Sequence, residues 1–246
     1  MTGYQAPPEI QLPADQNRLF QRVAVLERRF GALVSGAVPV TSTTHPTNPA
    51  TGMRIYETDT GLEAYWSGTA WVYPPQQIAE QVLGASAAFV TFGGIPQVFT
   101  HLLLEVSAKG DNTGGTSGYD NANLQFNGIT SGNYNWSTWY SVQGAGSVST
   151  AGGTSQTSMQ CAAIWNSHFG SAGRGIARIE IPNYSDTNNL KSFTGHSAAS
   201  DGGAAGVMQL YSGSLGGSNT AAITSIKVLM GTGNFVADST FTLYGM

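Results

Sequence analysis

The hydrophobic positions near the amino end of the chain repeat with a helical period, whereas those after residue 76 repeat with a strand period. Five apolar side chains are spaced by four, three, four and three residues, as along the seam of a heptad repeat: Leu19, Val23, Leu26, Phe30 and Leu33. With Leu19 at position d, Arg22 falls at g and Glu27 at the following e, where opposite charges meet across a parallel coiled coil. The spacing predicts a coiled-coil helix within an N-terminal attachment segment, residues 1–36.

The alternative explanation of this apolar stripe is a helix that packs on its own β-domain, as most amphipathic helices do. The stripe is narrow, however, and the residues between its members are mostly polar or charged, which favours self-association. The helix has fewer than three heptads, so it would need the help of trimerised domains further along the chain. We therefore expect a homotrimer joined through this helix.

Residues 37–75 read as a linker followed by a small β-meander. The linker is rich in Thr and Ser and contains Pro39, Pro46 and Pro49, which favour an extended chain. Turn-forming Thr-Asp-Thr-Gly and Ser-Gly-Thr then separate three strand-like runs, at 53–57, 62–66 and 70–73. Such a three-stranded meander is marginal by itself and needs partners.

Residues 76–246 predict a C-terminal antiparallel β-sandwich, jelly-roll-like in architecture. Apolar Ala177, Ile179 and Ile181 alternate with polar neighbours, as on a strand with one buried face. Similar runs occur at 87–92, 97–108, 123–127, 134–142, 157–165, 174–182, 204–211, 221–230 and 235–244, with a weak one near 190–195. Pro75 to Leu83 predicts a short helix, and Gly-rich stretches predict loops at 110–118, 144–153 and 197–206. The whole chain is therefore predicted to be mainly β.

Composition narrows the class of protein. Of the 246 residues, 32 are glycine and 10% are charged, and the net charge is −4. A nucleic-acid binder needs a basic face and a helical cytosolic enzyme carries many more Lys and Glu, so both classes are disfavoured. No stretch of 18 apolar residues predicts a membrane span, and residues 1–13 lack the pattern of a secretory signal. We expect no nucleic-acid partner, no membrane insertion and synthesis in a cytoplasm.

Two parts of the sequence resemble bacteriophage virion proteins. The string from Gly52 through Ile55-Tyr-Glu-Thr-Asp-Thr-Gly61, Tyr65-Trp66, Gly68-Thr69 and Trp71-Val72 is similar to a small module of tail and other virion proteins. A looser likeness to a β-domain of tail-fibre and minor structural proteins spans about 150 residues. It is carried by Ile95-Pro-Gln97, Thr100-His-Leu-Leu-Leu104, Leu124-Gln-Phe-Asn-Gly128, Asn133-Tyr134, Ile179-Glu-Ile-Pro-Asn-Tyr184, Lys191 and Thr240-Phe-Thr-Leu-Tyr-Gly-Met246.

This resemblance implies a non-enzymatic structural protein of the virion, a trimeric tail fibre or minor tail protein of the receptor-binding type. Its N-terminal segment would dock to other virion proteins, and its β-sandwich would be presented to a host surface glycan or protein. A capsid head fibre or decoration protein, attached through the same N-terminal segment, stays open as an alternative. A hydrolase of envelope polysaccharide is the other alternative.

Residues with catalytic or metal-binding chemistry are sparse. Asp111 and Asp120 are candidates for the carboxylate pair of a hydrolase or for a calcium loop, but aspartates in Gly-rich turns have ordinary turn roles and the stretch does not match an EF-hand. The histidines lack the spacing of a zinc enzyme: His45, His101, His168 and His196. Cys161 is the only cysteine and is expected to be a buried, inert thiol. We expect no catalytic residue, no metal and no cofactor.

An aromatic cluster between residues 133 and 140 is the one candidate for ligand binding. On a strand, Tyr134, Trp136 and Tyr140 share one face and Trp139 takes the other. Core packing, with the polar ring atoms satisfied at the margin, explains such a cluster in most proteins. A stacking surface for a sugar ring is the functional alternative.

Overall fold

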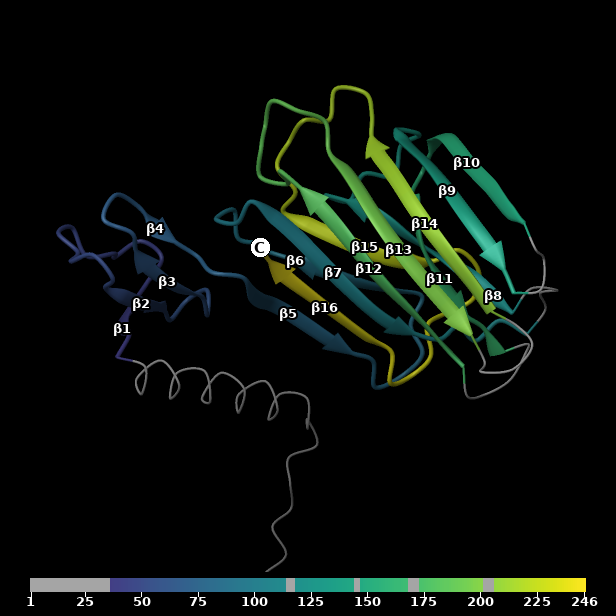
Figure 1. Ribbon diagram of the computed structural model, residues 1–246, viewed down its shortest axis with the longest axis horizontal. Coiled ribbons are helices and arrows are strands. Elements are labelled where there is room, and N and C mark those ends of the chain that lie inside the picture. Colours follow the sequence, from purple (N-terminus) through teal and green to yellow (C-terminus); the bar gives the residue numbers. More distant parts are fainter. Residues whose placement is uncertain (1–35, 114–117, 144–146, 168–172, 201–205) are drawn as a thin grey trace, which may run out of the picture. The chain divides into compact units, whose positions relative to one another are not determined.

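The computed structural model describes residues 36–113, 118–143, 147–167, 173–200 and 206–246, and this part of the chain is mainly β (Figure 1). Its strands are β1 to β16, and none of the described residues is in an α-helix. It follows that no helix long and apolar enough for a membrane span occurs among these residues. Two compact units divide between Tyr73 and Pro74.

The N-terminal unit contains a four-stranded sheet in the order β1-β2-β3-β4, whose strands are Val38–Val40, Arg54–Glu57, Glu63–Trp66 and Trp71–Val72. The antiparallel β2, β3 and β4 confirm the predicted meander. The predicted linker contributes β1, which pairs in parallel with β2 and places Val38 opposite Ile55. Ile55, Leu62 and Ala64 are buried between these elements.

The C-terminal unit consists of two antiparallel sheets. The large sheet has eight strands, in the spatial order β10 (Val148–Gln156), β9 (Tyr134–Val142), β14 (Gly206–Leu215), β13 (Ser192–Ser200), β12 (Arg174–Pro182), β7 (His101–Ala108), β16 (Thr240–Gly245) and β5 (Gln76–Val82). The small sheet has the order β11 (Met159–Trp165), β8 (Tyr119–Phe126), β15 (Ser225–Met230) and β6 (Phe89–Gly93). The sheets pack face to face, which makes this unit a β-sandwich (Figure 1).

Strand β11 lies at the centre of the sandwich, and all seven of its residues are buried. It packs on β12, β13 and β14, where Gly175 of β12 and Ala199 of β13 lie directly opposite each other. These small residues leave room for the backbone of β11 at close range. The Ser197 hydroxyl of β13 accepts a hydrogen bond of 2.9 Å from the Ala163 N–H, so this edge-strand amide is satisfied by the opposite sheet.

Three of the predictions from sequence were wrong. Residues 76–82 form β5 and not a helix, because pairing with β16 outweighs the helix preference of its Gln, Ala and Glu residues. Strand β10 occupies most of the predicted loop at 144–153; it is a mostly exposed edge strand of Gly, Ser and Thr, without hydrophobic alternation. Strand β13 includes the weak run near 190–195 and continues to Ser200, into the predicted loop at 197–206.

We expect Gly175→Ala to destabilise the C-terminal unit. A Cβ at this position would lie 2.5 Å from the Ala163 carbonyl oxygen and 2.8 Å from the Ile164 Cα, both backbone atoms that cannot rotate away. Overpacking of this kind costs about 1–3 kcal/mol in the free energy of unfolding, to be measured by urea denaturation. Gly93→Ala in β6 is the control, because an added Cβ there has nothing within 4 Å. Equal unfolding free energies for the two variants would contradict the close approach of β11.

Candidate functional site

The face of the large sheet that points away from the small sheet, here called the open face, is the principal candidate for a functional surface. The alternation of β12 shows how the sequence makes it: Gly175, Ala177, Ile179 and Ile181 are buried between the sheets, whereas the residues between them are exposed. Those exposed residues include Ile176, so the open face is not purely polar. A strand of a one-sided sheet ordinarily presents polar side chains to solvent.

The register of the strands aligns eight uncharged residues, one from each strand, in a row across the open face; we call it the uncharged row. In spatial order the uncharged row contains Val148, Ser141, Met208, Ala198, Ile176, Ser107, Thr240 and Val82. Its four large members are exposed to 68%, 60%, 59% and 55% for Val148, Met208, Ile176 and Val82. Met208, Ala198 and Ile176 are consecutive in this row, whereas Ser141 separates Val148 from them and Ser107 and Thr240 separate Val82. Contiguous exposed apolar residues mark an interaction surface, whereas single ones are ordinary.

The neighbouring row carries several of the charges of the open face and is called the charged row. It contains Thr150, Trp139, Leu210, His196, Arg178, Glu105, Thr242 and Glu80 in spatial order. Arg178 and Glu105 are directly opposite each other on β12 and β7. The Arg178 Nε also lies 3.8 Å from the Glu180 Oε1 on the same strand. Opposite charges therefore lie side by side near the middle of the sheet.

A hollow of about 530 Å³ lies between these two rows. Ile176, Met208 and Leu210 line it together with Glu105, Arg178 and His196. A smaller hollow of about 220 Å³ shares Arg178 and His196 with the first. The surface thus combines aliphatic and thioether groups with a few charged ones, which suits contact with another folded chain.

The structure divides the four aromatic residues of the predicted sugar site. Tyr134 belongs to the core, where its hydroxyl accepts a hydrogen bond of 2.9 Å from the Phe126 N–H. Trp136 and Tyr140 are half-buried on the same inner face of β9, and Tyr140 packs against the cluster that contains Trp165. Trp139 alone lies on the open face, exposed to 63%, directly opposite Leu210. The predicted alternation is confirmed, but these four side chains do not form one surface.

The other residues singled out from the sequence either make hydrogen bonds within the fold or lie outside the described residues. The oligomerisation residues all belong to the latter group: Leu19, Arg22, Val23, Leu26, Glu27, Phe30 and Leu33. Asp111 accepts hydrogen bonds from the Asn234 N–H at 2.7 Å and from its side-chain amide at 2.9 Å. Burial raises the pKa of Asp111, but these bonds and one from Ser86 outweigh it and hold the pKa below its usual value. Asp120 accepts a hydrogen bond of 3.0 Å from Asn112.

Cys161 has the surroundings expected of an inert thiol. Its side chain is fully buried in β11, and burial raises the pKa of the thiol. The Sγ lies 3.4 Å from the Ala122 carbonyl oxygen, to which it donates a weak hydrogen bond. The thiolate is therefore disfavoured at neutral pH.

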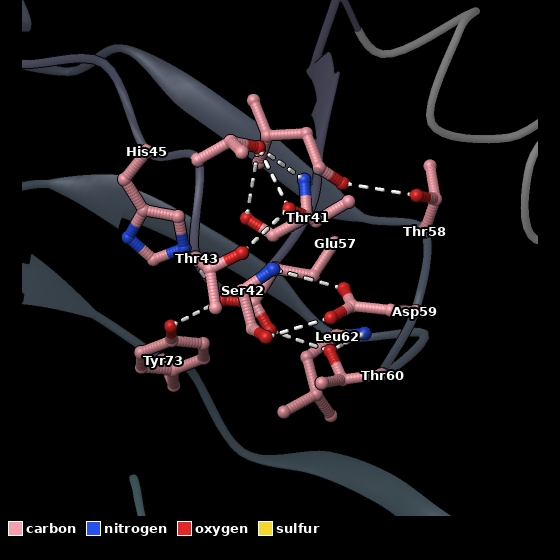
Figure 2. Close-up of polar contacts among 12 residues, drawn as sticks. Thr41, Ser42, Thr43, His45, Glu57, Thr58, Asp59, Thr60, Leu62 and Tyr73 are labelled. Atoms are coloured by element: carbon pink, nitrogen blue, oxygen red, sulfur yellow. Dashed lines mark hydrogen bonds and ion pairs between the residues drawn. The ribbon is translucent and has the colours of Figure 1, made fainter.

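A second cluster of polar side chains surrounds Glu57 in the N-terminal unit (Figure 2). Glu57 is buried, and its Oε1 accepts hydrogen bonds from the Tyr73 hydroxyl at 2.5 Å and pairs with the His45 Nε2 at 2.7 Å. Its Oε2 accepts a hydrogen bond of 2.5 Å from the Thr60 hydroxyl. Since both carboxylate oxygens are engaged, this cluster holds segments of the fold together rather than offering a free acid or base.

The same cluster fastens the segment after β1 to the turn after β2. The Ser42 N–H and hydroxyl donate to the two carboxylate oxygens of Asp59, at 2.9 and 2.6 Å (Figure 2). The Ser42 hydrogen bonds hold the pKa of Asp59 below its usual value. Burial, together with the nearby Glu57 carboxylate, raises the pKa of Tyr73 and keeps its hydroxyl a donor. Residues that read as a linker in the sequence are thus part of the folded unit.

Sequence reasoning missed the open face and the buried carboxylate. The open face depends on register, which brings Ile176 and Met208 to either side of Ala198 although they are far apart in the sequence. The sequence did contain a signal for the buried carboxylate, because Glu57 follows two apolar residues of a predicted strand. No local pattern, however, identified His45 or Tyr73 as its hydrogen-bond partners.

Comparisons with protein-family models, with curated proteins and with solved structures found no match. Among the described residues, no group of three or more His, Cys, Asp and Glu side chains is arranged to hold a metal ion.

We expect Glu57→Gln to destabilise the N-terminal unit. The amide would present donor hydrogens where the carboxylate accepts them from Tyr73, His45 and Thr60. Leaving buried groups unsatisfied costs about 1–3 kcal/mol, to be followed through the near-ultraviolet signal of Trp66 and Trp71 during unfolding.

Glu63→Gln is the matched control for this substitution. Glu63 pairs with Arg54 at 2.8 Å, and both side chains are substantially exposed. Such a surface pair contributes less than about 1 kcal/mol, so this variant is expected to unfold nearly as the parent does. If Glu57→Gln behaved like Glu63→Gln, the buried carboxylate would not hold the unit together.

Proposed function

We propose that this chain is a non-enzymatic structural protein of a bacteriophage virion, a trimeric tail fibre or minor tail protein of the receptor-binding type. Its N-terminal segment would form a coiled coil and dock to other virion proteins. Its C-terminal sandwich, of the jelly-roll type, would be presented to a glycan or protein of the host surface. It would be made in the host cytoplasm and work in the virion.

The open face is the observation that carries this proposal. An uncharged row with four large exposed apolar side chains crosses an eight-stranded sheet, beside a row with only four charged or titratable members. Such a surface favours association with another molecule, because monomeric soluble proteins rarely expose apolar patches of this kind. A protein that acts by assembly and attachment fits this surface better than one that acts by catalysis.

The described carboxylates support a binding role over hydrolysis of polysaccharide. Asp111 is engaged by Asn234 and Ser86, and Glu57 by three donors, so neither has the environment of a general acid. Glu105 and Glu180 both lie beside Arg178 on the open face, and the Glu180 Oε1 is 3.8 Å from the Arg178 Nε.

Attachment to the particle is tested by immunogold electron microscopy with an antibody against residues 74–246. We expect gold at the distal end of the tail or its fibres, because the N-terminal segment would dock and the sandwich would point outward. Gold on the head would contradict the tail-fibre proposal and favour the capsid head fibre or decoration protein. Release of reducing sugar from host envelope by the purified protein would favour the hydrolase.

A further inference from the structure

We propose that the open face of the large sheet is covered by other copies of this chain, so that the C-terminal unit carries an oligomerisation surface of its own, separate from the proposed coiled coil. The contact would centre on the uncharged row, with Arg178 and Glu105 pairing between copies. This inference rests on the proposed function only in taking the chain to assemble with itself.

The side chains of the open face are better suited to bind a protein than a sugar. Met208, Ile176 and Leu210 are aliphatic or thioether side chains, each more than half exposed, and they line the hollow of about 530 Å³. A sugar site relies on aromatic stacking and a dense set of hydrogen-bonding groups, but Trp139 is the only aromatic side chain in either row. Apolar groups of this kind gain most from burial against a similar surface.

Among possible protein partners, the charges of the open face favour a second copy of this chain. Arg178 and Glu105 are adjacent in register, at strands β12 and β7 near the middle of the sheet. In a homotrimer around one axis, the middle strands of three such sheets come together, and Arg178 of each copy can reach Glu105 of the next. The surface is therefore complementary to itself, which is what an interface between identical chains requires.

The size of the open face is sufficient for a stable contact. Eight strands span about 34 Å, and the two rows with the adjoining row of Ser137, Ser212 and Thr194 span about 20 Å along the strands. The resulting surface of about 700 Å² per copy approaches the roughly 800 Å² per partner of standard protein interfaces. Val148 on the edge strand β10 and Val82 on the edge strand β5 extend the apolar contact to both margins.

Cross-linking of the purified full-length chain tests this inference. Met208→Cys and Ser107→Cys each introduce a thiol in the uncharged row, and Thr91→Cys introduces one on the exposed side of β6 in the small sheet. Cys161 does not interfere because it is fully buried. With a short bismaleimide, we expect at least one of the first two variants to give about 10-fold more linked chains than Thr91→Cys, since reaction follows thiol access and proximity. Equal linking in all three variants, or linking in none, would overturn the inference.

A charge placed in the uncharged row then identifies the contact that produces the cross-link. Ile176→Glu, added to the thiol variant that links, is expected to lower the yield about 10-fold or more because an unpaired charge is costly in an interface. Phe89→Glu is the control: Phe89 is half-exposed on β6, and Lys227 lies 4.0 Å from its ring. Linking that survives Ile176→Glu would mean that the open face is not the contact. Because location on the particle is measured separately by antibody labelling, failure of this inference is distinguishable from failure of the proposed function.

Discussion

The packing of β11 against the small residues of the large sheet is the contact on which the C-terminal unit depends. Gly175 and Ala199 let the backbone of β11 approach closely, and the Ser197 hydroxyl satisfies an amide that an edge strand would otherwise bury unpaired. The small sheet is thereby held on one face of the large sheet. The opposite face keeps the alternation of a half-buried strand but presents apolar side chains where solvent-exposed residues are usually polar. A closely packed inner face and an outer face with exposed apolar side chains therefore come from the same strands.

The N-terminal unit depends on a different kind of contact. Its sheet of four short strands buries few apolar side chains, and the carboxylate of Glu57 joins the segment after β1, the turn after β2 and the residue after β4. A buried carboxylate with this set of donors orders the unit through hydrogen bonds where a hydrophobic core is small. The segment after β1, which reads as a linker in the sequence, is therefore part of a folded unit.

Local patterns were sufficient to predict that the described part of the chain is mainly β, and to predict the strands with hydrophobic alternation, such as the run Ala177, Ile179 and Ile181 of β12. They failed where tertiary pairing decides the outcome. Strand β10 has no apolar alternation and exists because β9 offers it hydrogen bonds, and β5 has a helix-like composition but pairs with β16. The open face was beyond local reasoning, because Met208, Ala198 and Ile176 become neighbours only through the register of three strands. Alternation did predict that Trp139 faces away from Tyr134, but not which of the two sides is the core.

We propose that the open face is an association surface and is not left exposed to solvent. Oxidation of the methionines in the native, unmodified chain tests it most directly, because methionine sulfoxide forms fastest at accessible sulfur atoms. Within one chain Met208 is exposed to 60% and Met246 to 39%, so an uncovered face would make Met208 the faster of the two to oxidise. If copies of the chain cover the open face, Met208 oxidises more slowly than Met246. Oxidation in the order of single-chain exposure would contradict the account.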